Sequence, residues 1–358
     1  MKRLHRQLLL GAFALLCASG ERAHAAACTA ATPDCSEWLS VAGGPQRVLL
    51  YRSHALDARN SAIERALVMV HGRGRTVGNY FRSAMAAAFL AGALENTIVI
   101  APRFASNEEG NDCHDKLAAD ELNWVCNGPE SWRNGGSAVG KAQVTSYQAT
   151  DEILQRLARK DLFPNLRSIV LAGHSAGGQY TTRYAMANTS HDRIGISLRY
   201  VVANPSSYTY PDALRPTGDA APGSSPNVAS ARTRPAVSFQ AFADADKCAA
   251  FDQWPYGMQK RVGYSAQFPS EQLIKQLTSR PTTFLVGEYD IFPVNGFDAS
   301  CSAMAQGPTR LARGLAYGRY LNEKFGASHR TMVVPNCGHD ARCIFTNNRI
   351  LPLLFPGE

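Results

Sequence analysis

Beyond its first 25 residues, the sequence lacks any apolar run near the roughly 18 residues that a membrane-spanning helix requires. It has no internal repeat and no block of lysine and arginine interleaved with aromatic residues, so neither a membrane span nor a nucleic-acid partner is expected. No HExxH motif or comparable His/Asp pairing is present, and we therefore expect no metal and no cofactor. Charged residues make up only 18% of the 358 residues and hydrophobic residues 45%, which favours a globular chain with a substantial core.

The first 25 residues have the pattern of a signal peptide. Lys2, Arg3 and Arg6 form a basic head, and an unbroken apolar run follows at 8–18. Ala23-His24-Ala25 then supplies the small-x-small pattern of a cleavage site. We expect export, with cleavage near Ala25 and a secreted or periplasmic product that forms a single domain over residues 26–358.

Cysteine usage agrees with export. Of nine cysteines, eight remain after the predicted signal peptide. An even number in an exported chain favours disulfides over metal binding, and no CxxC pair is present. Many connectivities are open to eight cysteines, and we favour the local pairing Cys28–Cys35, Cys113–Cys126, Cys248–Cys301 and Cys337–Cys343.

Short apolar runs alternate with longer helical patterns along the chain. The runs are rich in β-branched residues, as is typical of strands buried on both faces of a parallel sheet. Together they predict an α/β fold with a doubly wound, mostly parallel sheet flanked by helices and with disulfide-stapled loops. The expected strands are 66–70, 97–101, 168–172, 198–203, 283–286 and 331–334, and the expected helices are 80–90, 146–160, 175–188, 270–278 and 309–325.

Two segments interrupt this alternation, near 104–140 and near 205–265. Both follow the carboxyl ends of predicted strands, where ligands bind in such sheets, so we expect them to shape a substrate pocket. Trp124, Trp132 and Tyr208 are the candidate pocket residues. Surface decoration is the alternative role for these segments.

The strongest local motif is Gly173-His174-Ser175-Ala176-Gly177, a GxSxG between a predicted strand and a predicted helix. Serine becomes a good nucleophile when a base takes its proton and a sharp turn exposes its oxygen. The strand–turn–helix context is the one in which GxSxG forms a nucleophile elbow, and Ser175 is therefore the candidate nucleophile. A glycine-rich turn with a buried serine is the alternative.

A base and an orienting acid should follow the serine in the order Ser, Asp/Glu, His. Only His339 follows the final predicted strand at the end where Ser175 emerges, and it is the candidate base. Asp290, just after the strand at 283–286, is the candidate acid that holds the imidazole ring. Glu288 is its nearest competitor, and Asp244 and Asp246 are weaker choices.

An oxyanion formed during acyl transfer needs two N–H donors fixed in place. The amide of Ala176, at the start of the helix that follows the nucleophile, is one candidate. The amide of Arg73, in the loop after the strand at 66–70, is the other, with Gly72 as its alternative.

These motifs resemble those of the α/β-hydrolase superfamily, of the secreted serine esterase/lipase type. The resemblance covers about residues 45–350 and includes the His71-Gly72 loop with Arg75 and Tyr80-Phe81, the Gly-His-Ser-Ala-Gly-Gly-Gln elbow, and Ala203-Asn204-Pro205-Ser206-Ser207-Tyr208. It implies a Ser–Asp–His triad on Ser175, Asp290 and His339, but it supplies no substrate. The loop around the histidine, flanked by cysteines, is also loosely similar to secreted cutinase-like and polyesterase-like enzymes.

The sequence thus predicts an exported, monomeric serine hydrolase that cleaves small-molecule or polymeric carboxylic esters through an acyl-enzyme. Three alternatives remain: a polyester or feruloyl-type depolymerase, a serine peptidase on the same fold, and a binding protein without activity. The last is expected to have lost a member of the triad, whereas all three candidates are present.

Overall fold

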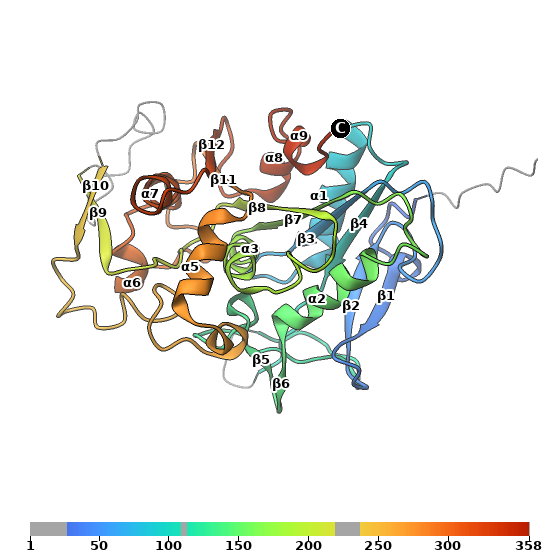
Figure 1. The fold of residues 1–358 in the computed structure, drawn as a ribbon, viewed down its shortest axis with the longest axis horizontal. Helices are drawn as coiled ribbons and strands as arrows, with labels where there is room; N and C mark the ends of the chain where they lie inside the picture. The colour runs from blue at the N-terminus through green and yellow to red at the C-terminus, as the bar shows by residue number, and fades with distance from the viewer. Residues whose placement is uncertain (1–26, 109–112, 219–236, 358) are drawn as a thin grey trace, which may run out of the picture.

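The computed structural model describes residues 27–108, 113–218 and 237–357. Its centre is an eight-stranded sheet in the order β1-β2-β4-β3-β7-β8-β11-β12 (Figure 1). The six strands from β4 to β12 are parallel, whereas β2 runs antiparallel to both of its neighbours. The predicted signal peptide over 1–25 lies outside the described residues.

All six predicted strands are confirmed. They are β3 (Arg65–Val70), β4 (Thr97–Pro102), β7 (Ser168–His174), β8 (Ser197–Ala203), β11 (Thr282–Gly287) and β12 (Arg330–Val334). The edge strand β1 (Ser36–Ser40) and its neighbour β2 (Arg47–Arg52) were not predicted, because their half-buried residues do not form a continuous apolar run. Two small sheets lie outside the main one and consist of β5 (Ser137–Ala138) with β6 (Lys141–Thr145) and of β9 (Leu214–Gly218) with β10 (Val237–Ala241).

Helices cover both faces of the sheet, as the doubly wound prediction requires (Figure 1). On one face lie α1 (Val77–Leu90), α8 (Ala341–Phe345) and α9 (Leu351–Leu354), and on the other α2 (Ser146–Leu157), α3 (Ala176–Ala187) and α5 (Ser270–Ser279). The long helix α7 (Arg310–Phe325) packs on β11 and β12. The short helix α6 (Cys301–Met304) follows the loop after β11.

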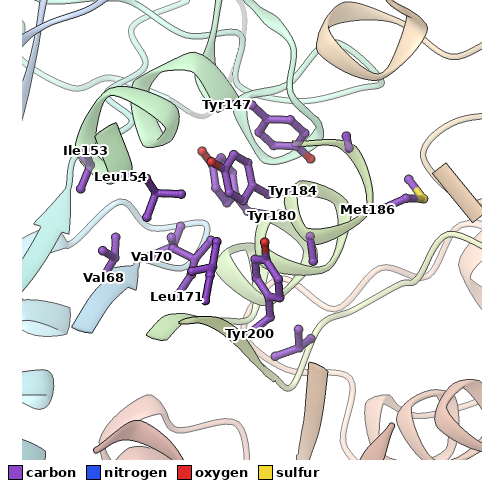
Figure 2. Packing of buried hydrophobic residues seen from close by; sticks show 14 of the residues in the cluster. Val68, Val70, Tyr147, Ile153, Leu154, Leu171, Tyr180, Tyr184, Met186 and Tyr200 are labelled. Carbon is purple, nitrogen blue, oxygen red and sulfur yellow. The ribbon is translucent and has the colours of Figure 1, made fainter. Parts of the chain in front are cut away.

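Successive side chains of each strand point to opposite faces of the sheet, and this alternation divides the core into two layers. Val68 and Val70 of β3 face the helices α2 and α3, whereas Leu67 and Met69 face α1. Successive side chains in a strand point to opposite faces, so a strand buried on both sides must be apolar throughout. Figure 2 shows the first layer, where Leu171 and the β3 valines face aromatic rings and aliphatic side chains of α2 and α3.

The register of the parallel strands brings their carboxyl ends to one edge of the sheet. Val70 pairs with Gly173, His174 with Ala203, and Gly287 with Val334. The chain passes from β3 outward to β4 and then returns to β7 on the other side of β3. Ligands bind at such a reversal of strand order, at the carboxyl ends. The segments after β3, β7, β11 and β12 all begin at this edge.

The four disulfides have the predicted local pairing, Cys28–Cys35, Cys113–Cys126, Cys248–Cys301 and Cys337–Cys343. The last of them closes the turn that carries His339. Within the described residues, no helix combines the length and apolar character needed to cross a membrane.

Candidate active site

Ser175 stands on a sharp turn between β7 and α3. Its backbone has φ 59° and ψ −119°, a conformation that residues other than glycine rarely adopt. Close packing keeps the turn in place. A Cβ at Gly173 would overlap the carbonyl oxygen of Gly177, and one at Gly177 would overlap the carbonyl oxygen of Val70. The glycines of GxSxG are therefore needed because backbone from β3 and α3 occupies the space of a side chain.

The three predicted triad residues form one hydrogen-bonded chain. His339 Nε2 lies 3.0 Å from Ser175 Oγ, and His339 Nδ1 lies 2.8 Å from Asp290 Oδ2. With Asp290 ionised, its carboxylate accepts from Nδ1–H, which leaves the Nε2 lone pair for the serine hydroxyl proton. The residues come from the turns after β7, β11 and β12, and their separations in sequence are as large as 164 positions.

Asp290 is fixed by a residue that the sequence analysis did not identify. Arg310, at the start of α7, donates from Nη1 to Asp290 Oδ1 at 3.3 Å, and neither side chain is exposed. Its Nε donates to Ser206 Oγ at 2.7 Å. Burial lowers the pKa of Arg310, and the charge of Asp290 opposes that shift. The sequence did contain one indication of this role. An arginine in the first turn of a helix interacts unfavourably with the helix dipole, so its presence there indicates a compensating interaction elsewhere.

Asp290 and Ser175, and none of the competing acids, are the hydrogen-bond partners of the two ring nitrogens of His339. Glu288 is buried and accepts a hydrogen bond from the amide of Asn336, at 3.0 Å, in the turn after β12. Asp244 pairs with Lys247 at the surface, and Asp246 is exposed. Of the four carboxylates considered, Asp290 is the one with the geometry of an orienting acid.

Asn204, which directly follows β8, forms hydrogen bonds both to the segment that carries Asp290 and to the turn that carries His339. Its Oδ1 accepts from the amide of Gly287 at 2.8 Å, and its Nδ2 donates to the carbonyl of Gly338 at 3.1 Å. The ring of His174 packs on that of His339 with centroids 4.6 Å apart. Burial, followed by the charges of His339 and Arg310, lowers the pKa of His174, which keeps this second ring neutral.

The loop after β3 lies beside Ser175. A Cβ at Gly72 would come within 3.5 Å of the Ser175 Cβ and 2.5 Å of the Tyr80 hydroxyl, so only glycine allows this approach. The buried His71 holds the loop, because its Nε2 accepts from the amide of Phe104 and its Nδ1–H donates to Gly72 O, both at 2.9 Å. The Arg73 and Ala176 amides remain the predicted oxyanion donors.

The burial of His71 predicts a pH dependence of stability. Desolvation lowers its pKa from 6.5 to about 4. Above pH 6.5 the ring is neutral in both the folded and the unfolded chain, whereas between 6.5 and about 4 only the unfolded chain takes up the proton. The free energy of unfolding should therefore fall as the pH falls through this window, by about 2 kcal/mol at pH 5 from this residue.

Urea unfolding at pH 7.5 and pH 5 measures this contribution. Between the two pH values, the free energy of unfolding should fall by about 2 kcal/mol more in the wild type than in His71→Gln. His114→Gln, at an exposed histidine, is the control, and its free energy of unfolding should fall by as much as that of the wild type. Equal losses in the wild type and His71→Gln would contradict the assignment.

A cleft of about 490 Å³ opens at the triad, and both Ser175 and His339 line it. The other lining residues include Arg73, Thr76, Tyr80, Asn295 and Asp340. Within the described residues, no group of three His, Cys, Asp or Glu side chains could hold a metal ion.

The predicted pocket aromatics require a correction. Trp124, Trp132 and Tyr208 do not line the cleft but are at most 2% exposed within the core. Trp132 stacks on Phe104, with centroids 5.3 Å apart, and Tyr208 stacks on Tyr317 at 4.3 Å. The two inserted segments thus extend the hydrophobic core with their large rings, because burying those surfaces is more favourable than exposing them.

Comparison with known proteins relates the whole arrangement to a family. The family model described as "Alpha/beta hydrolase family" matches residues 67–349. The fold is similar to that of a poly(3-hydroxybutyrate) depolymerase from Bordetella parapertussis, with 19% identity, a TM-score of 0.57, and coverage of 88% of this chain and 86% of that chain. It is also similar to poly(aspartic acid) hydrolase-1 from Sphingomonas sp. KT-1, with 18% identity, a TM-score of 0.55, and coverage of 89% and 97%. No curated protein matches the sequence.

Proposed function

Because the chain belongs to the alpha/beta hydrolase family, we propose that it is a serine hydrolase that cleaves carboxylic esters through an acyl-enzyme. The observation that carries the proposal is the continuous hydrogen-bonded chain from Ser175 through His339 to Asp290. Ser175 is the nucleophile, His339 the general base and acid, and Asp290 the group that orients the ring. The mechanism requires no cofactor.

The reaction proceeds in two halves. His339 Nε2 takes the proton of Ser175 Oγ as the oxygen attacks the ester carbonyl, and the amides of Arg73 and Ala176 stabilise the oxyanion. Asp290 stabilises the imidazolium that forms. The tetrahedral intermediate then expels the alcohol, which leaves with the proton from His339. In the second half, His339 deprotonates a water that attacks the acyl-enzyme, and the acid is released as the proton returns to Ser175.

The proposal also covers where and in what form the enzyme works. Residues 1–25 direct export and are removed near Ala25, and residues 26–358 form one catalytic domain that acts as a monomer. Four disulfides support a secreted or periplasmic location, because disulfides persist in oxidising compartments.

A polymeric ester is the second candidate substrate. Two proteins of similar fold are a poly(3-hydroxybutyrate) depolymerase and a poly(aspartic acid) hydrolase. The first of these polymers is joined by ester bonds and the second by amide bonds, so the first suggests that a polymeric ester should be included in the assays of this chain. A serine peptidase would use the same triad and would differ in the group that it releases.

Parallel assays distinguish these activities. The purified mature chain is tested on p-nitrophenyl esters from acetate to palmitate, on peptide anilides and on poly(3-hydroxybutyrate) particles. The proposal predicts turnover of esters at a rate well above that of anilides, whether or not the polymer is degraded. Anilide cleavage with no ester turnover would contradict it.

A further inference from the structure

A second pocket, of about 220 Å³, lies beside α3. Two arginines, Arg133 and Arg183, line it together with Gln179, Ser207 and Tyr256. Its walls come from both inserted segments and from α3. We refer to it as the arginine pocket.

Arg183 is a buried cation without an acidic partner. Its side chain projects from α3, and the residue is 1% exposed. Its hydrogen bonds go to neutral acceptors, which are Asn134 Oδ1, Thr209 Oγ1, Ser207 Oγ and the carbonyl of Pro255. None of the ion pairs among the described residues includes it. A buried charge is costly unless an opposite charge compensates it, so this site has an unmet preference for an anion.

Arg133 adds a second positive charge to the same pocket. Within the described part of the chain, Arg133 makes one hydrogen bond to another side chain, and it is a long one, 3.4 Å from Nη2 to Asn127 Oδ1. Burial lowers the pKa of Arg133. Burial also lowers the pKa of Arg183 to about 10, and the charge of Arg133 contributes to that shift. Both groups nevertheless remain protonated at neutral pH, so their charges repel each other across the pocket.

Among the described residues that line the pocket, one is a carboxylate, Asp298, and it already has partners. Asp298 Oδ2 accepts from the hydroxyl of Tyr256 at 2.8 Å, and its Oδ1 accepts from the amide of Ser300 at 3.1 Å. Its charge acts on Arg133 in the pocket and also on Arg310 and Arg313, so it compensates Arg133 only in part. The described lining therefore carries a net positive charge even with Asp298 ionised.

The arginine pocket lies within reach of the proposed nucleophile. Gln179 and Arg183 follow Ser175 along α3, and at about 1.5 Å per residue they lie about 6 and 12 Å further along the helix axis. Arg73, which lines the triad cleft, is close enough to Arg133 for its charge to lower the pKa of that residue. The loop after β11 borders both spaces, with Asn295 and Gly296 at the cleft and Asp298 at the pocket.

We propose that the arginine pocket binds a carboxylate on the acyl part of the substrate, so that the preferred substrates are esters whose acyl chain ends in a free carboxylate. The inference rests on the proposed function of the triad. The acyl part is the part concerned because the leaving alcohol must lie against His339, which protonates it, and no residue of the 336–341 turn lines the pocket. A planar guanidinium pair suits the two oxygens of a carboxylate.

Matched esters and matched variants test the proposal. The substrates are the monoethyl esters of succinate, adipate and suberate, each compared with its neutral diethyl ester. Arg133 is replaced by Gln and by Lys, and the exposed Arg82 by Gln as a control with the same loss of charge. The wild type should prefer at least one half-ester over its diester in kcat/KM.

The variants should separate charge from geometry. Arg133→Gln should lower kcat/KM for the preferred half-ester by about tenfold to a hundredfold and change that for the diester by less than about twofold. Arg133→Lys should lower kcat/KM for the half-ester by less than Arg133→Gln does, because lysine keeps the positive charge although it lacks the planar guanidinium group. Arg82→Gln should behave as the wild type.

A binding measurement makes the outcome independent of turnover. Whichever of monoethyl succinate, adipate and suberate the wild type prefers is titrated calorimetrically into Ser175→Ala and into the double variant Ser175→Ala/Arg133→Gln, and its binding should be at least about tenfold weaker in the second. Equal binding in the two proteins, or a wild type that favours the diesters throughout, would overturn the proposal and leave the esterase function standing. Failure to hydrolyse either kind of ester would instead contradict the proposed function.

Discussion

Replacing Ser175 by alanine is expected to abolish ester hydrolysis, with a fall in kcat on the order of 10⁶-fold. The oxygen that attacks the carbonyl is lost, and His339 has no hydroxyl left to deprotonate. The residual rate would come from water acting beside the oxyanion donors. Steady-state kinetics on a p-nitrophenyl ester measure the effect.

The variant must also remain folded for this loss to be interpreted. Ser175 lines the cleft on a turn whose packing depends on glycines, so removal of one oxygen should leave the urea midpoint nearly unchanged. Ser61→Ala, at an exposed serine, is the matched control and should retain full activity. A folded Ser175→Ala protein that kept more than about 1% of the wild-type kcat would be incompatible with the nucleophile assignment.

Replacing Asp290 by asparagine should lower kcat by about 10⁴-fold, because the ring of His339 loses the anion that selects its tautomer and stabilises the imidazolium. Stability should fall as well. Arg310 is fully buried and would lose its carboxylate partner. Breaking one side of such a buried pair commonly costs about 3–5 kcal/mol. Kinetics and urea unfolding of the same preparation separate the two effects.

Glu288→Gln is the matched control for this change. It makes the same carboxylate-to-amide replacement two residues away, at a buried side chain that bonds the amide of Asn336. It should retain most of the wild-type kcat even if stability falls. If Glu288→Gln reduced kcat more than Asp290→Asn does, Glu288 would have to be the acid in solution.

The parts of the fold that were predictable are those in which local sequence and burial agree. The strand at 97–102 is buried at every position, so its apolar run is continuous and easily recognised. The edge strand Ser36–Ser40 has one buried residue, and a pattern of that kind resembles a loop. The helices α6, α8 and α9 have only four or five residues each, too few for a helical period to be recognised.

The candidate site was predictable to the extent that topology constrains it. In a parallel sheet the turns at the carboxyl ends lie at one edge, so a serine, an acid and a histidine placed after three of its strands were expected to lie near one another. The supporting residues could not be inferred in this way. Arg183 bonds Asn134, 49 positions away, and Asn204 bonds Gly338, 134 positions away, and such contacts follow from packing that periodicity does not encode.

The prediction for the aromatic residues of the two inserted segments was wrong. Trp124 and Trp132 were expected to contact substrate because they stand in polar segments beside the sheet. Segments of this size must bury their own large rings to be stable, and both tryptophans do so against Phe104. The arginines Arg133 and Arg183, which carry no hydrophobic signal, are among the residues that line the arginine pocket.

One measurement tests the central claim most directly. The wild-type chain is treated with a fluorophosphonate, which phosphonylates activated serines, and the adduct is located by peptide mass mapping. The account predicts one adduct, on Ser175, that forms in step with the loss of esterase activity and is absent from Ser175→Ala. An adduct on another serine that forms in step with inactivation, or full activity in a chain labelled at Ser175, would contradict it.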